Sequence, residues 1–304
     1  MKTGDQTVLT LCLPSPLRED AAAGRVNIVN RIGLALAPAG WRLLIEGNNA
    51  CDHAAAVARG YALLHMHEPE SPRALCLRRA YHYPFWHIEA TNQRWNFDVA
   101  RAGFCAETVN PGQAAEFFRR WRAKILGDQR TTRDGFVFVP LQGRLLQQRS
   151  FQAASPLAMI EAVLQADPNR RVLATLHPNE IHDPAEIAAL DALEARFPRF
   201  RRVAADAKAL LGACDHVVTQ NSSVALSGYF AGKPAVLFAG IDFHHIAGSV
   251  PRDGQQAAFA QLQGPAPDFA AYVYWFFKLH AVNGGAPEAE DQIRARFRRF
   301  GWPL

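Results

Sequence analysis

The chain has 304 residues, of which 49% are hydrophobic, and this is enough to bury the core of one large domain or of two modest ones. No segment approaches the roughly 18 consecutive apolar residues of a membrane span, and five cysteines without a C-x-x-C pair favour buried, reduced thiols over disulfides or a cysteine zinc site. The net charge of +5 comes mainly from scattered arginines, and the absence of a long basic block argues against nucleic-acid binding.

The first half of the chain has the pattern of a small α/β domain. Short apolar runs predict strands, and stretches with helical periodicity predict helices. The expected strands are residues 8–13, 41–45, 61–65 and 75–77, and the expected helices are residues 18–37 and 49–59. No small-residue cleavage site follows the first strand at the right distance, so we interpret it as part of the fold and expect a cytoplasmic protein without a signal peptide.

An aromatic and polar segment, residues 81–95, follows these elements without a clear period. A helix is predicted over residues 113–126, with its aromatic side chains on one face. The next stretch, residues 127–134, is polar throughout, and we interpret it as a linker. The first domain is therefore expected to cover residues 1–130.

The second half alternates strands and helices, which is typical of a parallel sheet covered on both faces. Ser155-Pro156 and Asp183-Pro184 are typical helix starts. The expected strands are residues 135–140, 171–176, a short one near Val203, 216–219 and 235–239, and further helices are expected over residues 206–213 and 222–231. We predict an α/β fold with two Rossmann-like halves, of which the second is a doubly wound parallel sheet over residues 131–281. A charged helix in the segment 282–304 is expected to be able to pack back on the first domain.

The clearest candidate site is the run Gln220-Asn221-Ser222-Ser223, which lies where a predicted strand ends and a helix begins. Ligands of open α/β sheets bind at the carboxyl ends of the strands, and the unpaired N–H groups of a helix start attract anions. The two serine hydroxyls add donors with little bulk. The alternative is that Asn221 or Ser222 only caps the helix.

A second polar run, His177-Pro178-Asn179-Glu180, also follows a predicted strand. A histidine at this place can donate to a phosphate oxygen, or act as an acid or base near neutral pH. The alternative is a surface histidine in a turn. Because both runs follow strands of one sheet, we expect them to face the same crevice.

Other histidines raise the question of a metal site. His244 and His245 follow a further strand, but adjacent side chains of an extended chain point in different directions. His65, His67 and Glu68 have a better spacing, provided that this segment is extended. One buried and one solvated side chain is the simpler interpretation, and we predict no metal.

Taken together, these pieces resemble the capsule-polysaccharide biosynthesis family that includes bacterial Kdo transferases, and more distantly the bacterial sialyltransferases of the two-domain GT-B type. The pieces occur in the family's order over residues 135–245. They are Val139-Pro140-Leu141-Gln142, Ser155-Pro156, His177-Pro178, Asn221-Ser222-Ser223 and Gly232-Lys233-Pro234. The first 130 residues show no such resemblance.

The resemblance implies a GT-B-like fold whose second domain holds a nucleotide-sugar donor such as a CMP-sugar, and whose first domain takes a glycan or glycolipid acceptor. His177 corresponds to the histidine of the family's His-Pro motif near the donor phosphate, and Ser222 and Ser223 to paired hydroxyls on that phosphate. The other expected donor residues are Gln142, Asn179, Gln220 and Asn221. Such enzymes need no metal or other cofactor, because the nucleotide-sugar is a substrate.

The chain departs from the family after the Pro-Leu-Gln strand, where the family carries an acidic residue and residues 143–150 contain none. An inverting transfer needs a base for the acceptor hydroxyl. Asp134 precedes a glycine, as the acid of the sialyltransferases does, and is our first candidate for this catalytic base; its alternative is a turn. Glu89 and His87, in the aromatic segment, are further candidates.

Three functions remain open. The first is a glycosyltransferase of surface or capsular polysaccharide synthesis with a CMP-Kdo-like donor. The second is a non-catalytic relative that binds a nucleotide or a glycan, which the missing acid motivates. The third is a GT-B-like nucleotide-sugar epimerase or hydrolase. An arginine-rich surface is compatible with an acidic glycan, or with peripheral association at a membrane.

Overall fold

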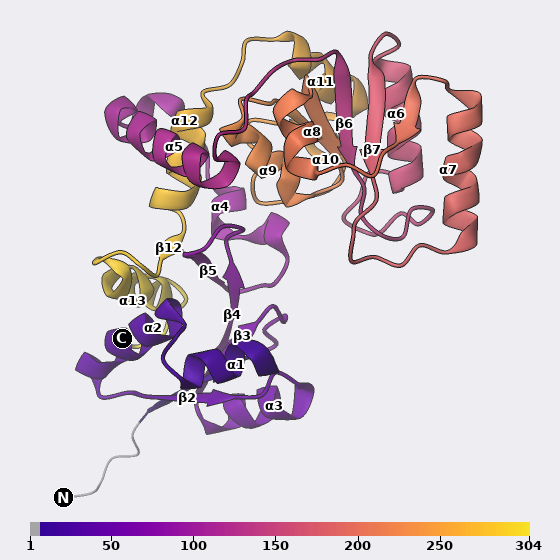
Figure 1. The fold of residues 1–304 in the computed structure, drawn as a ribbon. Coiled ribbons are helices and arrows are strands. Elements are labelled where there is room, and N and C mark those ends of the chain that lie inside the picture. Colours follow the sequence, from indigo (N-terminus) through magenta and orange to yellow (C-terminus); the bar gives the residue numbers. More distant parts are fainter. Residues whose placement is uncertain (1–6) are drawn as a thin grey trace, which may run out of the picture. The chain divides into compact units, whose positions relative to one another are not determined.

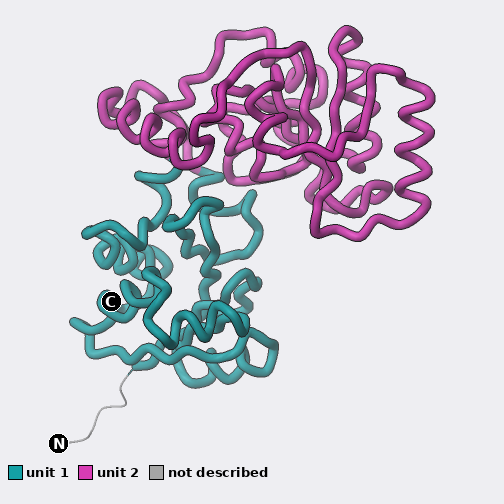
Figure 2. Tube along the Cα trace, in the orientation of Figure 1, with its two compact units in different colours: residues 1–101, 276–304 teal, residues 102–275 magenta. Residues whose placement is uncertain are grey.

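The computed structural model describes residues 7–304, and the chain divides into two compact units. Unit 1 comprises Met1–Arg101 and Phe276–Leu304, and unit 2 comprises Ala102–Trp275 (Figure 2). The boundaries expected from the sequence, after residues 130 and 281, differ from these. Residues 102–130 group with unit 2 because the helix that they contain packs on that unit's other helices. No helix among residues 7–304 is both long and apolar enough to cross a membrane.

Unit 1 is built on a six-stranded sheet in the order β12-β5-β4-β3-β1-β2. Strands β1 to β4 are parallel, and β5 is antiparallel to both β4 and β12. The strands are β1 (Val8–Cys12), β2 (Arg42–Glu46), β3 (Tyr61–His65), β4 (Ala74–Arg79), β5 (Phe85–Glu89) and β12 (Val282–Asn283) (Figure 1). The helices are α1 (Ser15–Ala22), α2 (Asn27–Leu36), α3 (Ala50–Arg59), α4 (Asp98–Arg101) and α13 (Ala289–Arg299).

Two elements of unit 1 differ from the sequence prediction. The single helix expected over residues 18–37 is two helices, because Gly24 takes a left-handed φ of 72° and ends the first one. The aromatic segment contains the unpredicted strand β5, in which all five residues are buried. A strand buried on both faces lacks the alternation of apolar and polar residues by which strands are recognised.

The two faces of the unit 1 sheet are covered unequally. On one face, large side chains of α2 and α13, such as Ile32, Ile293 and Phe297, form an extensive core with the strands. A separate, smaller cluster lies against α3 and consists mainly of small residues: Cys12, Ala56, Ala62, Leu64 and Ala74. Less apolar surface is therefore buried beneath α3.

Unit 2 holds a second six-stranded sheet, in the order β11-β10-β9-β6-β7-β8, and all of its strands are parallel. They are β6 (Phe136–Pro140), β7 (Arg171–Thr175), β8 (Phe200–Arg202), β9 (His216–Thr219), β10 (Ala235–Leu237) and β11 (Gly248–Ser249). The helices are α5 (Pro111–Leu126), α6 (Pro156–Ala166), α7 (Pro184–Arg196), α8 (Ala207–Ala213), α9 (Ser223–Phe230), α10 (Val250–Asp253), α11 (Gln255–Ala260) and α12 (Phe269–Tyr274).

The helix starts of unit 2 follow the predicted capping chemistry. Ser155 caps α6 by accepting a hydrogen bond from the Ala158 N–H, and Asp183 caps α7 in a capping box with Glu186. Helix α5 joins the unit through a stacked contact between Phe118 and Phe230, with ring centroids 5.8 Å apart.

The strand order of unit 2 creates a switch point in the sheet. From β6 the chain runs outward to β7 and β8, and then returns to the other side of β6 to form β9, β10 and β11. The connections on the two sides therefore diverge at the carboxyl ends of β6 and β9. In open α/β sheets such a switch point is where a ligand-binding crevice forms.

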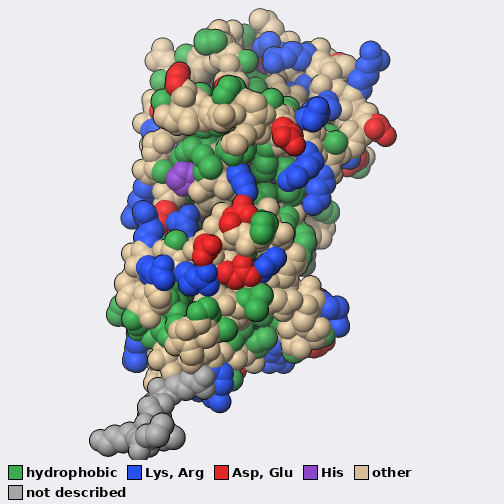
Figure 3. All heavy atoms as spheres, turned by 90° about the vertical axis from the view of Figure 1, so that its left-hand side faces the viewer, with side chains coloured by type: hydrophobic (Ala, Val, Ile, Leu, Met, Phe, Trp, Pro, Cys, Tyr) green, Lys and Arg blue, Asp and Glu red, His purple; other side chains and the backbone are tan. Residues whose placement is uncertain are grey.

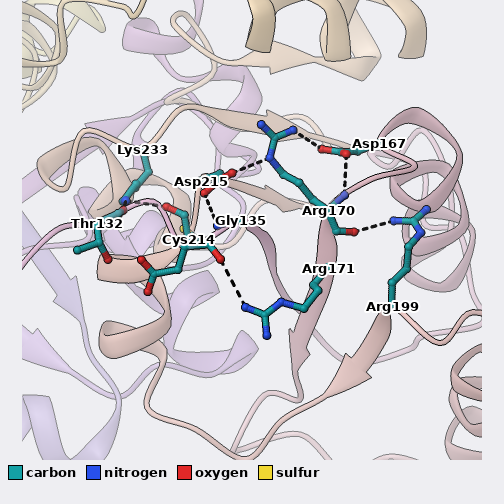
Figure 4. A network of polar contacts seen from close by, with 10 residues as sticks. Thr132, Gly135, Asp167, Arg170, Arg171, Arg199, Cys214, Asp215 and Lys233 are labelled. Atoms are coloured by element: carbon teal, nitrogen blue, oxygen red, sulfur yellow. Dashed lines mark hydrogen bonds and ion pairs between the residues drawn. The ribbon is translucent and has the colours of Figure 1, made fainter.

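Polar contacts hold the opposite, amino edge of the same sheet together (Figure 4). Arg170 donates to Asp215 at 2.6 Å and to Asp167 at 2.8 Å, and Asp215 also accepts from the Gly135 N–H at 3.0 Å. The Lys233 ammonium binds the carbonyl oxygens of Cys214 and Thr132. These contacts join the loops before β6, β7, β9 and β10, so they have a structural role at this edge.

His216, the first residue of β9, should make the stability of the chain depend on pH. Burial lowers its pKa from 6.5 to about 4. The unfolded chain therefore takes up a proton near pH 6.5 that the folded chain does not accept until pH 4. The free energy of unfolding should fall as the pH drops through this window, by up to about 1.4 kcal/mol per pH unit for this group.

Urea unfolding of the wild type and of His216→Gln at pH 7.5 and pH 5 measures this effect. His65 and His280, whose pKa values burial also lowers to about 4, are common to both proteins and cancel in the comparison. We expect a smaller loss of stability in the variant. Equal losses in both proteins would assign the acid sensitivity to other groups.

Charged side chains of both signs are dispersed over the face seen in Figure 3. On the face seen in Figure 3, Lys and Arg side chains form several separate groups with Asp and Glu between them. Ion pairs in the described chain include Arg31 with Glu290 and Arg202 with Glu194.

Candidate functional site

Gln142 and Asn221 meet at the switch point of the unit 2 sheet. Gln142 lies two residues beyond the end of β6, and Asn221 lies two residues beyond the end of β9. The Asn221 N–H donates to Oε1 of Gln142 at 3.5 Å. Beneath them, the Thr219 hydroxyl donates to the carbonyl oxygen of Pro140 at 2.9 Å. Two residues that the sequence analysis assigned to the nucleotide-sugar donor are thus in contact at the switch point of the sheet.

Helix α9 begins at this place. Ser222 is its N-cap, and its hydroxyl oxygen accepts from the Val224 N–H at 3.3 Å. Ser223, the first helical residue, is exposed. The cap uses an oxygen lone pair of Ser222 and leaves its O–H proton for a ligand. Capping and ligand binding are therefore compatible, and the helix end adds a partial positive charge.

His177 lies on the loop that follows β7, the neighbour of β6 in the sheet. The side chains of His177 and Asn179 are exposed. Nδ1 of His177 accepts a hydrogen bond from the Asn179 N–H at 3.2 Å. In the neutral ring the proton is then on Nε2, so this nitrogen is a donor. The loop presents that donor at the same sheet edge as Gln142 and Ser222.

Glu180, on the same loop, supplies a carboxylate that the sequence analysis did not assign to the site. Its side chain lies against Gly143, the first residue of the segment in which an acid is missing. A Cβ atom at Gly143 would stand only 2.3 Å from Oε2 of Glu180, so glycine at this position leaves room for the carboxylate. No sequence signal links the two positions, because they come from loops after different strands.

The loop after β6 also carries positive charge. Arg144 is exposed, and Arg149 is half-buried with its guanidinium over the Phe151 ring. Burial, and next the charge of Arg144, lower the pKa of Arg149, while Glu180 acts in the opposite direction. The positive charges of Arg144 and Arg149 repel each other, and Glu180 is the carboxylate that acts against this repulsion. A bound anion such as a phosphate would stabilise both arginines further.

Gln220, also predicted to bind the donor, lies beneath the site. It is 1% exposed, and its Nε2 donates to the carbonyl oxygen of Ala154 at 3.0 Å. The same loop is held at β10 by a bond from the Ala153 N–H to the Phe238 carbonyl at 2.7 Å. Gln220 therefore holds in place the loop that carries Gln142.

A buried carboxylate, Glu186, joins the two loops of the site. It accepts from the Leu145 N–H on the loop after β6, and from the Asp183 N–H at 3.3 Å on the loop after β7. His182 Nδ1 contacts the same carboxylate at 3.2 Å. The sequence shows the capping box Asp183-x-x-Glu186, but it does not show the contact with Leu145.

A cavity of about 510 Å³ adjoins the His177 loop. It lies beyond the carboxyl ends of β7 and β8 and is lined by Thr175, Leu176, Glu194, Arg202, Val203, Ala204 and Ala205. Its volume is in the range of small-molecule sites.

Asp134 is not brought to this site. It precedes β6 and therefore lies at the amino edge of the sheet, where its N–H donates to the Ala213 carbonyl at 2.9 Å. Gln142 follows the carboxyl end of the same strand. A strand of five residues separates the two edges by about 16 Å at roughly 3.3 Å per residue.

The other two candidate bases lie in the core of unit 1. His87 and Glu89 are each 2% exposed. The His87 ring packs against Phe97 and Phe276, and burial, followed by the charge of Arg296, lowers its pKa far below the usual value. Glu89 accepts from the Asp98 N–H at 3.1 Å. Both residues thus support the fold of unit 1.

The remaining histidines do not form a metal centre in the described part of the chain. Met66 has a φ of 59°, so the segment from His65 to His67 is not extended and the spacing argument fails. His245 contacts the Tyr272 hydroxyl at 3.0 Å and the Ala102 carbonyl at 3.1 Å. Within residues 7–304, no group of three or more His, Cys, Asp or Glu residues is placed to hold a metal ion.

No known protein family and no curated protein matches the chain. Among solved structures, the beta Kdo 2,7 transferase KpsC of Thermosulfurimonas dismutans matches with a TM-score of 0.54 and 11% identity, over 97% of this chain and 99% of that one. The chain has the GT-B fold. The KpsC beta Kdo 2,4 transferase of the same organism matches less well, with a TM-score of 0.43 and 12% identity over 88% of this chain and 90% of that one.

A UDP-GlcNAc 2-epimerase from Neisseria meningitidis also matches, with a TM-score of 0.35 and 10% identity over 97% of this chain and all of that one. A Kdo transferase, a member of the group named by the sequence resemblance, is thus among the structural neighbours of the chain. The predicted fold class, two Rossmann-like α/β halves with a parallel second sheet, is confirmed.

Proposed function

We propose that the chain is a glycosyltransferase of surface polysaccharide synthesis, which moves a sugar from a nucleotide-sugar donor of the CMP-Kdo type to a glycan or glycolipid acceptor in the cytoplasm. The contact between Gln142 and Asn221 at the switch point of unit 2, beside the start of α9, carries the proposal. This arrangement offers N–H and O–H donors where α/β sheets bind nucleotides. The fold shared with a Kdo transferase supports it.

The donor phosphate would lie between the Ser222 and Ser223 hydroxyls at the α9 start and Nε2 of His177. Arg149 adds positive charge from the loop after β6. The cavity beyond β7 and β8 offers room for the rest of the donor, since its volume of about 510 Å³ is that of a small-ligand site.

The transfer itself is proposed to invert the sugar's anomeric centre. The acceptor oxygen bonds to the anomeric carbon while its proton passes to the carboxylate of Glu180. The bond between the anomeric carbon and the phosphate oxygen breaks, and its electron pair leaves with the nucleotide. Side-chain donors and the α9 end stabilise the departing phosphate in place of a metal ion. Residue Glu180 thus replaces Asp134 as our candidate base.

Replacing Ser222 by aspartate should weaken nucleotide binding at least tenfold. Aspartate is as good an N-cap as serine, so α9 keeps its start, but the new charge repels the phosphate. Asn110→Asp is the matched control, because Asn110 caps α5 away from the sheet and gains the same charge. Titration calorimetry with CMP, CDP and UDP measures both variants. Equal nucleotide affinity in the wild type and in Ser222→Asp would show that the start of α9 does not bind the phosphate.

The products then separate the three functions. Sugar transferred to an added glycan supports the glycosyltransferase. Nucleotide binding without turnover of any donor supports a non-catalytic binding protein, and an epimerised or free sugar formed without acceptor supports an epimerase or hydrolase. Chromatography of reactions with and without acceptor distinguishes these outcomes.

A further inference from the structure

Unit 1 contains a cavity of about 460 Å³ that the proposed donor site does not use. It lies between α3 and the loop that joins β3 to β4, both seen in Figure 1. Its residues are Ala50, His53, Ala54, Val57, Leu64, His67, Glu68, Glu70, Ser71 and Ala74. The volume is that of a small-molecule site.

The cavity follows from the way in which β3 and β4 are connected. Parallel neighbours usually need a crossover helix, but here residues 66–73 connect them as a loop. This part of the sheet is therefore covered by α3 and a loop, and the side chains beneath, Leu64 and Ala74, belong to the small cluster of this face. The cavity floor is thus apolar.

The hydrogen bonds around His53 fix which of its ring nitrogens remains an acceptor. Nδ2 of Asn48 donates to the His65 carbonyl oxygen at 3.1 Å, so Oδ1 of Asn48 is the atom that contacts Nε2 of His53 at 2.9 Å. An amide oxygen only accepts, so Nε2 carries the proton and Nδ1 of the neutral ring is a free lone pair. Burial, followed by the charge of His67, lowers the pKa of His53 and favours this neutral form.

The acidic residues of the cavity add further acceptors. Glu68 is held in place by the Thr91 hydroxyl and the Asn92 N–H, both at 2.7 Å. Glu70 is exposed beside it. None of the described residues that line the cavity is lysine or arginine. The cavity is therefore rich in acceptors and negative in charge, which disfavours anions and favours ligands with several O–H donors.

We propose that this cavity of unit 1 binds an uncharged sugar ring. The ring hydroxyls donate to Nδ1 of His53 and to the Glu70 carboxylate, and the C–H face of the ring packs on Val57, Leu64 and Ala74. This site is distinct from the donor site of unit 2 and does not require catalysis. A neutral sugar unit, and not an acidic one, is its ligand class.

Saturation-transfer NMR with methyl α-D-glucopyranoside, methyl β-D-galactopyranoside and methyl β-D-glucuronoside tests the proposal on the full chain. Ala54→Trp places an indole in the cavity from the exposed side of α3, and Ala55→Trp, on the next residue and outside the cavity, is its matched control. Glu70→Gln removes the exposed carboxylate.

We expect at least one uncharged pyranoside to bind the wild type and Ala55→Trp, and its affinity to fall at least tenfold in Ala54→Trp. Glu70→Gln should weaken the uncharged probe and not the glucuronoside. Binding of no uncharged probe, equal binding in Ala54→Trp, or preference for the glucuronoside would overturn the proposal, as would binding that EDTA abolishes. None of these outcomes bears on nucleotide binding by unit 2, which calorimetry measures separately.

Discussion

Glu180→Gln should lower the rate of sugar transfer by about 10² to 10⁴-fold, the usual contribution of a general base. The amide is nearly isosteric with the carboxylate but cannot accept the proton of the acceptor hydroxyl. Nucleotide affinity should not fall, since Glu180 is assigned to the acceptor's proton and the loss of its negative charge beside Arg149 does not weaken phosphate binding. Initial rates with saturating donor, together with calorimetry, measure both quantities.

Gly143→Ala should reproduce much of this loss without touching Glu180 chemically. The added methyl group would stand 2.3 Å from Oε2, so the carboxylate has to move, and a flexible exposed side chain can do so at little cost in stability. Gly103→Ala is the control, because nothing lies within 4 Å of a Cβ at that position. Full activity in both Glu180→Gln and Gly143→Ala would show that another group takes the proton.

The parallel sheet of unit 2 could be predicted because its information is local. Each strand is a short apolar run, and the helix starts at Ser155 and Asp183 show the serine or aspartate before proline that caps need. Because the strands are parallel, their carboxyl ends lie at one edge of the sheet, and Gln142, His177 and Ser222 all follow such ends. Such inferences require only the order of elements along the chain.

The position of the acid could not be predicted in the same way. Asp134 precedes the predicted strand 135–140, so the order of elements already places it at the amino edge of the sheet, and only the likeness to the acid-glycine pair of the sialyltransferases favoured it. Glu180 and Gly143 are brought together by two loops, and loop conformation depends on tertiary contacts such as the one between Glu186 and Leu145. The predicted pattern therefore locates the crevice but not its carboxylate.

The strand β5 was missed for a different reason. Its five residues, Phe85 to Glu89, are all buried, including the two polar ones, so polarity along the sequence does not report exposure. Its place between β4 and β12 is long-range information, because β12 comes from the end of the chain.

Glu186→Ala should lower the free energy of unfolding by about 2–4 kcal/mol, because each buried donor that loses its acceptor costs about 1–3 kcal/mol. Glu186 is 6% exposed, and its loss leaves the buried Leu145 N–H and the His182 ring without their acceptor. Glu161→Ala is the matched control, since Glu161 forms only an exposed pair with Arg196 at 3.5 Å, which is worth at most about 1 kcal/mol.

The same substitution should also disturb the site. Glu186 connects the loop of Gln142 and Gly143 to the loop of His177 and Glu180, so its removal should speed amide hydrogen exchange at Leu145 and weaken nucleotide binding. Glu186→Gln keeps one acceptor oxygen and should fall between wild type and alanine in urea unfolding. If Glu186→Ala loses no more stability than Glu161→Ala, the two loops are held by other contacts. A loss of stability with unchanged nucleotide affinity would show that Glu186 stabilises the fold but does not position the nucleotide site.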